Sequence, residues 1–398
     1  MPLITYLTET PNSKFKVYRS YHKWMNMKQL HLAKVHQALK AQMVPFVGWE
    51  MPLQYTSIAE EHMVVRESVG LFDISHMGEI SVRGGGAASF LQHVTTNDIS
   101  KLGVLDSQYS TVLNERGGIK DDIFIYRLGE QEYFVVVNAV NVKKICDWFK
   151  QHARGKIEVE DITLTTVMLA LQGPKAERVL QQLTDFELGG LKRFKAAFMK
   201  VVGLQLLVSR TGYTGEDGFE LYLMDEPASN PRRAEKLWNA LLSAGEGIGI
   251  RPCGIGARDT TRLEAGYVLY GNELAENITP FEARISYAVK LEKGEFIGRE
   301  ALMEQKRVGQ KRTRIGLRML ERGVPRQGYK LLKGGEEIGH VTSGTMSPLL
   351  NVGIAMGYAS PGLTPGEKIV VDIRGKSHAA EIVSWPFYDP DKYGFARK

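Results

Sequence analysis

The sequence predicts a mixed α+β chain of more than one domain that ends in a small β-barrel. Its 398 residues are enough for two or three domains with substantial cores. Helical patterns alternate with short β-branched strands through the first part of the chain, as in α+β proteins. From about residue 298 onward, glycine, proline and short strands dominate, which is typical of an all-β barrel.

The alternation predicts individual elements in chain order. An amphipathic pattern over Leu30–Gln42 predicts an opening helix. A glycine run at 84–86 precedes a second helix, and a Gly-Pro pair at 173–174 turns a strand into another helix. The second helix is expected to start at 88–91. Strands are expected at 133–137 and 168–171, and they are followed by helices at 142–151 and 175–183. In the barrel, strands are expected at 313–317, 337–341 and 368–373.

Composition limits the possible partners. Hydrophobic residues make up 43% of the chain and charged residues 24%, and no apolar run approaches the length of a membrane span. The formal net charge of +6 is carried by residues 1–49, which hold seven Lys or Arg residues against Glu9. Because the rest of the chain is neutral overall, it offers no basic excess for nucleic acid. We therefore expect neither a membrane nor a nucleic-acid partner.

Cysteine and histidine spacing argues against a metal site. Cys146 and Cys253 form no CxxC pair, and the nine histidines show no HExxH motif. Such sparse cysteine use suits a reducing cytosol, so we expect a cytoplasmic location. Residues 1–27 form a basic leader or extension. A mis-assigned start at Met25 or Met27, or a disordered extension, is favoured over a transit peptide, which would instead imply the mitochondrial matrix.

The segment Ser209–Glu220 carries three glycines, at 212, 215 and 218, and they form a turn between Tyr213 and Glu220 or directly before it. Glycine permits backbone angles that let such a turn fold tightly against a ligand. Beyond the turn, alternation predicts a strand with Glu220 and Tyr222 on the same side. A lone acid there could accept two hydrogen bonds from a flat amino-pyrimidine edge, such as that of a pterin. The alternative is a solvated β-hairpin with ordinary surface acids.

This glycine-rich segment resembles the signature of the glycine cleavage T-protein (aminomethyltransferase) family. The resemblance continues in family order over roughly residues 45 to 393, and several motifs in register are far more specific than one. The other family-like segments are Val47–Pro52, Leu71–Glu79, Thr95–Ile99, Leu113–Gly118, Leu171–Pro174, Gly256–Asp259, Arg262–Gly266, Val341–Gly344 and Pro386–Tyr388.

The resemblance implies a multi-domain cloverleaf, with two α+β folate-binding domains around a central cavity and a C-terminal β-barrel. Residues 28–285 would form the folate-binding region, with a first domain interrupted by a second at about 52–150, and residues 286–398 would form the barrel. The implied reaction transfers the methylene carbon of the aminomethyl group on lipoyl H-protein to tetrahydrofolate. Its products are 5,10-methylenetetrahydrofolate, ammonia and dihydrolipoyl H-protein. The implied partners are lipoylated H-protein and tetrahydrofolate as co-substrate, without metal or flavin.

The resemblance also assigns roles to charged residues. Asp98 would be the catalytic residue: it would lie beside the reacting N5 nitrogen of tetrahydrofolate, orient it and stabilise developing positive charge, although an Asx turn or helix cap is the alternative. Glu220 would hold the pterin edge. Arg258 would contact a folate oxygen, or else pair on a helix surface, as Asp259 is expected to do with Arg262.

Further pocket residues are carried over from the family as cofactor-binding groups. Tyr213 would pack on the ligand and offer its hydroxyl, with a core-covering role as the alternative. Asn114 and Tyr393 would line the pocket, and Met51 would form an apolar wall, with core packing as its alternative. By contrast, Glu216 and its neighbour Asp217 are expected to be turn and solvent residues.

Three other functions are alternatives for this sequence. A folate-binding paralogue in iron–sulfur maturation and tRNA modification carries a Lys-Gly-Cys-aromatic motif, which Glu264–Asn272 does not match. The folate module of sarcosine or dimethylglycine oxidases accompanies a flavin domain, and this chain has no strand-linked GxGxxG. A non-catalytic folate-binding subunit would be suggested by loss of Asp98, which is present. Tyr287 stands where the family commonly has Trp, which concerns the shape of the cavity.

Overall fold

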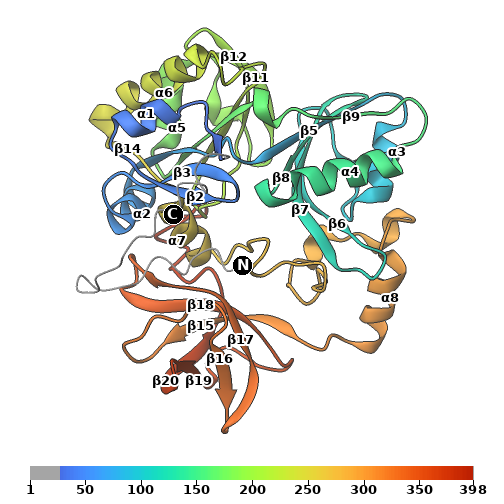
Figure 1. The fold of residues 1–398 in the computed structure, drawn as a ribbon, viewed down its shortest axis with the longest axis vertical. Helices are drawn as coiled ribbons and strands as arrows, with labels where there is room; N and C mark the ends of the chain where they lie inside the picture. The colour runs from blue at the N-terminus through green and yellow to red at the C-terminus, as the bar shows by residue number, and fades with distance from the viewer. Residues whose placement is uncertain (1–26, 398) are drawn as a thin grey trace.

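The computed structural model describes residues 27–397 and consists of two α+β parts above a β-barrel (Figure 1). A small sheet of β1 (Lys28–Gln29), β3 (Trp49–Gln54) and β2 (Gln42–Phe46) opens the fold, with α1 (Ala33–Ala38) between its first two strands in sequence. The expected opening helix is thus shorter than Leu30–Gln42. The chain turns at Lys40, which has a left-handed φ of 59°, and Gln42 already begins a strand.

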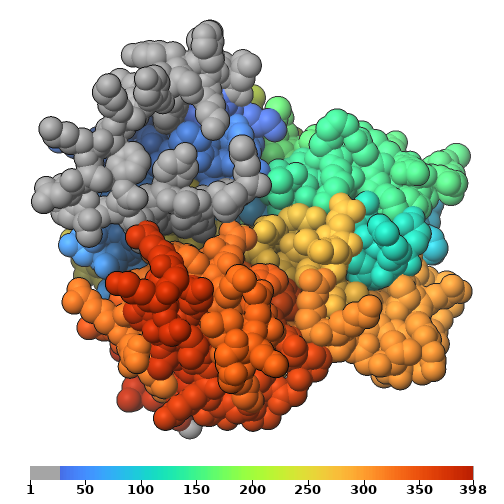
Figure 2. Space-filling view, turned by 60° about the horizontal axis from the view of Figure 1, so that its bottom comes forward, coloured from blue at the N-terminus to red at the C-terminus, as the bar shows by residue number. Residues whose placement is uncertain are grey.

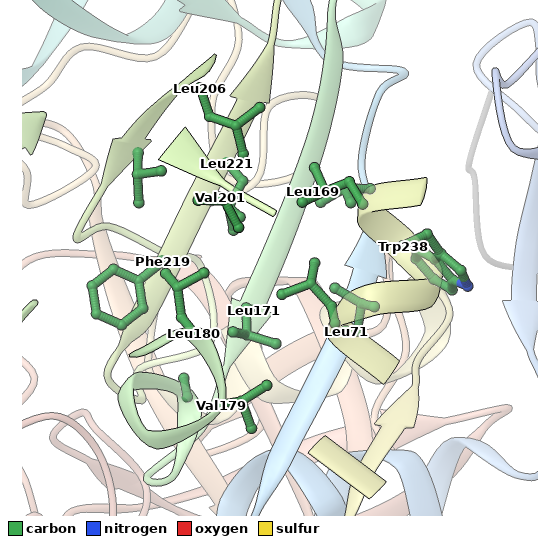
Figure 3. Packing of buried hydrophobic residues seen from close by; sticks show 14 of the residues in the cluster. Leu71, Leu169, Leu171, Val179, Leu180, Val201, Leu206, Phe219, Leu221 and Trp238 are labelled. Atoms are coloured by element: carbon green, nitrogen blue, oxygen red, sulfur yellow. The ribbon is translucent and has the colours of Figure 1, made fainter. Parts of the chain in front are cut away.

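A six-stranded sheet forms the first α+β part. Its order is β11 (Ala196–Val201), β12 (Leu204–Ser209), β13 (Gly218–Leu223), β10 (Val167–Gln172), β4 (Val69–Asp73) and β14 (Ile250–Pro252). Helices α5 (Ala176–Leu180) and α6 (Arg232–Gly245) cover one face. Leucine and valine side chains of the strands meet Val179, Leu180 and Trp238 there (Figure 3). The strand and helix expected at 168–171 and 175–183 are confirmed, except that residues 181–183 form a 3₁₀ turn.

A five-stranded sheet lies between β4 and β10 in sequence, although those two strands pair directly with each other. Its order is β6 (Ser107–Leu113), β7 (Ile119–Gly129), β8 (Glu132–Val137), β5 (Gly78–Arg83) and β9 (Glu158–Asp161). Helices α3 (Ala87–Val94) and α4 (Val142–His152) pack on its outer face, close to the predicted bounds. This topology is consistent with one domain interrupting another, while the predicted domain boundaries themselves stay a prediction.

The inner faces of the two sheets pack against each other. Tyr126, Phe134 and Val136 of the five-stranded sheet join Phe72 and Tyr222 of the six-stranded sheet in one buried cluster. Because side chains of a strand alternate between faces, Phe219 and Leu221 point into the other core, and their neighbours on β13 point toward this junction. The junction therefore receives side chains from both sheets.

A closed six-stranded barrel ends the fold and lies against the rest of the molecule (Figure 2). Its order is β15 (Thr313–Met319), β18 (Val352–Ala359), β17 (Glu336–Ser347), β16 (Lys330–Lys333), β19 (Lys368–Ile373) and β20 (Lys376–Val383). The prediction of a mixed α+β fold with a C-terminal barrel is confirmed. Helices α2 (Ile58–Glu67) and α7 (Ile255–Glu264) pack together, and α7 also contacts β17 of the barrel.

The expectation of strands alone after residue 298 is wrong at one point. Helix α8 (Arg299–Val308) precedes the barrel and is built largely of straight-chain residues that favour helix. Its Leu302 is buried in a cluster with Leu113 and Ile119 of the β6–β7 hairpin, so tertiary packing also holds it. None of the helices within residues 27–397 is both long and apolar enough to cross a membrane.

Candidate functional site at the junction of the two sheets

A buried carboxylate marks the junction. Glu220 on β13 is 8% exposed, and its Oε2 accepts hydrogen bonds from Thr211 Oγ1 at 2.5 Å and from the Tyr222 hydroxyl at 3.3 Å. The hydroxyl of Tyr126, on β7 of the other sheet, lies 3.0 Å from that of Tyr222. Glu220 and Tyr222 therefore lie on the same side of their strand, as predicted, and the expectation of a solvated hairpin with surface acids is wrong for Glu220.

The environment of Glu220 disfavours its charge. Burial raises the pKa of the Glu220 carboxyl, while the hydrogen bond from Thr211 and the positive charge of Arg258 act in the opposite direction. A ligand that donates further hydrogen bonds to this carboxylate would stabilise its charged form.

The glycine-rich turn is held by close packing. A Cβ at Gly212 would lie 1.9 Å from Oε1 of Gln172, so only glycine fits without movement there. The same Gln172 donates to the Thr211 carbonyl at 3.1 Å and accepts from the Thr214 hydroxyl at 2.9 Å. These contacts fix the backbone on which Thr211 and Tyr213 sit.

Glu216 of this turn is a correction to the sequence prediction. It is 3% exposed and forms an ion pair with Arg66 at 3.0 Å, and it also pairs with Arg397 near the C-terminus. Arg66 binds Glu264 as well, at 3.0 Å. Asp217, by contrast, is partly exposed and pairs with Arg210. Glu216 therefore stabilises the turn through buried ion pairs and is not exposed to solvent.

Arg258 and Tyr213 face each other near Glu220. The guanidinium carbon of Arg258 on α7 lies 4.8 Å from the Tyr213 ring centroid, and its Nη1 is buried without a hydrogen-bond partner among residues 27–397. Burial lowers the pKa of Arg258, while the negative charge of Glu220 raises it. The Tyr213 hydroxyl donates to the Val268 carbonyl, so that hydroxyl is already engaged. The predicted pairing of Asp259 with Arg262 is present at 2.8 Å and leaves Arg258 available.

An aromatic row runs from the Glu220 side of β7 toward the loop that bears Asp98. Phe124 lies 5.9 Å from Tyr126 and 6.2 Å from Tyr109 on β6, measured between ring centroids. Tyr109 in turn lies 5.9 Å from Tyr287, whose side chain is 64% exposed. Phe124 also stacks on Phe194 at 5.9 Å. The row lines this side of the sheet with aromatic side chains, on which a planar ring can pack.

Asp98 precedes the 3₁₀ turn Ile99–Lys101 and caps it. Its Oδ1 accepts hydrogen bonds from Ser100 N at 3.1 Å, Ser100 Oγ at 2.6 Å and Gln92 Nε2 at 3.0 Å. No residue in the described range donates to Oδ2. Burial raises the pKa of Asp98, but these hydrogen bonds outweigh it and hold the pKa below its ordinary value. Asp98 is thus a cap, as the alternative expected, and still offers one uncommitted anionic oxygen.

The remaining predicted residues are placed in different surroundings. Asn114 uses its amide within the β6–β7 turn, accepting from Gly118 N at 2.9 Å and donating to the Glu276 carbonyl at 2.9 Å. Met51 is fully buried in a cluster with Leu30 and Trp49, which favours its core alternative. Tyr393 lies near the C-terminus with its ring 6.5 Å from that of Tyr388. Tyr388 itself approaches the glycine-rich turn through the Gly215 carbonyl at 3.5 Å.

Two surface hollows of about 440 and 290 Å³ lie beside α8, away from Glu220. Neither is lined by a predicted site residue, so the central cavity implied by the resemblance stays a prediction. Among residues 27–397, no group of three or more His, Cys, Asp or Glu side chains is arranged to hold a metal ion.

Sequence reasoning did not name every neighbour of Glu220. Thr211 lies within the segment Ser209–Glu220, and its hydroxyl beside a glycine turn was a usable signal, whereas Tyr222 was expected on the side of Glu220 but not as its hydrogen-bond donor. Tyr126 is 96 residues from Tyr222 in sequence, and its place in a strand of alternating apolar residues marks it only as core.

Comparisons with known proteins cover almost the whole described chain. Residues 32–293 match a family model described as "GCVT N-terminal domain", and residues 312–389 match "Glycine cleavage T-protein C-terminal barrel domain". An aminomethyltransferase of Geobacillus thermodenitrificans is 49% identical over 91% of this chain and 98% of its own. A probable aminomethyltransferase of Thermococcus kodakarensis is 43% identical over 94% of this chain and 100% of its own. The crystal structure of glycine cleavage system aminomethyltransferase T from Bartonella henselae matches with a TM-score of 0.84 and 35% identity, covering 93% of this chain and 99% of that one.

Proposed function

The chain belongs to the glycine cleavage T-protein family and is an aminomethyltransferase, and from this premise we propose that it uses tetrahydrofolate and lipoylated H-protein as its two substrates. The proposed reaction moves the methylene carbon of the aminomethyl group on the lipoyl sulfur to tetrahydrofolate. Ammonia and dihydrolipoyl H-protein are the other products. Tetrahydrofolate supplies the two amine nitrogens, N5 and N10, that hold the transferred carbon.

The buried carboxylate of Glu220 is the observation that carries this proposal. A pterin presents an amino group and a ring N–H side by side, and a carboxylate can accept both in nearly parallel hydrogen bonds. Thr211 and Tyr222 fix the Glu220 carboxylate by donating to Oε2. The aromatic row that passes Phe124 and Tyr109 supplies an apolar surface for the flat ring system. The residues present therefore fit a reduced folate.

Arg258 is proposed to meet an oxygen of the folate. Its buried Nη1 lacks a partner within residues 27–397, and a buried guanidinium without a full set of hydrogen bonds is costly. A carbonyl or carboxylate oxygen of a ligand would satisfy it. Tyr213 packs against Arg258 and keeps it in place, and Tyr393, Asn114 and Met51 stay proposed pocket residues.

Asp98 is proposed as the catalytic residue. Its Oδ1 is held by three hydrogen bonds, so the carboxylate is fixed and Oδ2 remains for the ligand. The lowered pKa keeps Asp98 ionised at neutral pH. A fixed negative charge beside a reacting amine orients it and stabilises the positive charge that develops there.

The remaining features of the proposal concern location and rival functions. The matched relatives come from bacteria and archaea, which supports a cytoplasmic location. The alternatives of an iron–sulfur maturation paralogue and of a non-catalytic subunit have no observation in their favour.

The test is a reconstituted assay with aminomethylated H-protein, with and without tetrahydrofolate, that follows ammonia release. We expect Asp98→Asn to lower the folate-stimulated kcat by about a hundred- to ten-thousand-fold while folate still binds. Asp185→Asn is the control, because Asp185 is an exposed acid elsewhere on the surface. Equal rates for wild type and Asp98→Asn would remove Asp98 from the mechanism.

A further inference from the structure

The loop that bears Asp98 is tied to the neighbouring strand β6. Asn97 N donates to Ser110 Oγ at 2.9 Å, and Asn97 Nδ2 donates to the Tyr109 carbonyl at 2.9 Å. Thr96 donates its hydroxyl to the Ala288 carbonyl at 2.8 Å, so a distant segment of the chain also reaches this loop. These contacts hold the residues before Asp98 but leave its own side chain to other groups.

Lys293 approaches the same loop from the other side. Its Nζ lies 2.6 Å from the Gln92 carbonyl, 2.6 Å from the Thr95 carbonyl and 2.9 Å from the Asn97 carbonyl. An ammonium has three N–H bonds, and each finds one acceptor here. The three carbonyls belong to the last turn of α3 and the residues after it, where the helix dipole also favours a cation.

Gln92 joins Lys293 to Asp98. Its Nε2 donates to Asp98 Oδ1 at 3.0 Å and to the Lys293 carbonyl at 3.3 Å, while its Oε1 accepts from Ile99 N at 2.7 Å. Lys293 thus binds the backbone on which Gln92 and Asp98 sit, and Gln92 binds the Asp98 carboxylate itself. Burial lowers the pKa of Lys293 to about 7, and the negative charge of Asp98 acts in the opposite direction.

We propose that Lys293 is a positioning residue for the aminomethyl transfer, acting through the Asp98 loop and through Gln92 to hold Asp98 Oδ2 toward the reacting amine. The inference rests on the proposed catalytic role of Asp98. Removal of the Lys293 ammonium leaves three backbone carbonyls unbonded at one place, and the loop relaxes around them. A misplacement of a catalytic group by about 1 Å can cost a hundred-fold in rate.

The test is a double-mutant cycle of Lys293→Met and Asp98→Asn, with kcat, tetrahydrofolate affinity by calorimetry and Tm measured for each protein. Lys293→Met should lower kcat by roughly ten- to a hundred-fold and leave folate Kd within about three-fold of wild type. In the Asp98→Asn background the same substitution should lower kcat no further. Lys290→Met is the matched control, because Lys290 binds the loop through its backbone N–H, 2.9 Å from the Thr96 carbonyl, which the substitution retains.

The outcomes separate this inference from the proposed function. Full activity of Asp98→Asn would overturn the proposed catalytic role of Asp98, on which this inference rests. A slow Asp98→Asn together with an unchanged Lys293→Met, or with a Lys293→Met loss that persists undiminished in the double variant, would overturn the positioning role alone. An equal loss of kcat in Lys293→Met and in the control Lys290→Met would also overturn the positioning role. Should Lys293→Met fail to fold, Gln92→Leu replaces it in the cycle and must show the same non-additivity with Asp98→Asn.

Discussion

Replacement of Glu220 by Gln should weaken tetrahydrofolate binding without loosening the fold. The substitution retains the size of the side chain, but one oxygen becomes an amino group that donates where the carboxylate accepts. Hydrogen bonds to a charged group contribute about 1.5–3 kcal/mol each, whereas those between neutral groups contribute about 0.5–1.5 kcal/mol. For the two bonds proposed at the pterin edge the difference is about 2 kcal/mol, which is roughly thirty-fold in Kd.

The same substitution should leave Tm unchanged or raise it. Burial raises the pKa of Glu220, with Thr211 and Arg258 opposing, so its charged form is disfavoured in the folded protein. A carboxyl whose pKa is raised on folding destabilises the fold at higher pH, and the destabilisation is relieved as the pH falls through the folded pKa. Gln carries no charge at any pH and therefore avoids this destabilisation. Weaker binding by an equally stable protein would show that the charge serves the ligand.

The assay is calorimetric titration of tetrahydrofolate into wild type, Glu220→Gln and a control, with Tm measured for each. Asp225→Asn is the control, because Asp225 is exposed two residues beyond the end of β13 and the substitution removes the same negative charge. Its left-handed φ of 55° suits Asn. An unchanged Kd for Glu220→Gln, or an equal loss in the control, would refute the assignment of Glu220 to the pterin edge.

Two further predictions concern the buried charges that support the site. Arg66→Met removes the ion-pair partner that two buried carboxylates, Glu216 and Glu264, share, and it should lower the free energy of unfolding by about 3–5 kcal/mol in urea titrations. Arg83→Met removes the partner of Glu132 in an exposed pair and should lower it by at most about 1 kcal/mol; equal effects would contradict the reasoning. Burial raises the pKa of Asp73, but hydrogen bonds from His36 and Ser75 outweigh it and hold that pKa below its ordinary value. The contribution of the Asp73 carboxylate to the stability of the fold is therefore present above about pH 4 and is lost as the pH falls further. Asp73→Asn should therefore lower stability by about 1–3 kcal/mol at pH 7, and the deficit should shrink as the pH falls below about 4; a deficit that is constant with pH would speak against it.

The sequence was sufficient for the classes and order of most elements. A period of two along residues 368–373 and a continuous apolar run at 133–137 are local patterns, and each became the predicted strand. The glycine-rich turn was also readable, because the need for small residues there is a property of the backbone. The alternation after the turn placed Glu220 and Tyr222 on one side of β13, which is a consequence of strand geometry alone.

Tertiary structure decided which distant groups meet. Tyr126 reaches Tyr222 because two sheets pack face to face, Glu216 is buried because the C-terminal Arg397 and Arg66 cover it, and Lys293 binds a loop almost two hundred residues before it. Helix α8 was missed because the burial of Leu302 against another part of the chain adds to its local helix preference. Periodicity records which face of an element is apolar, whereas a hydrogen bond or ion pair between remote residues leaves no repeat along the sequence, so only the folded arrangement could show it.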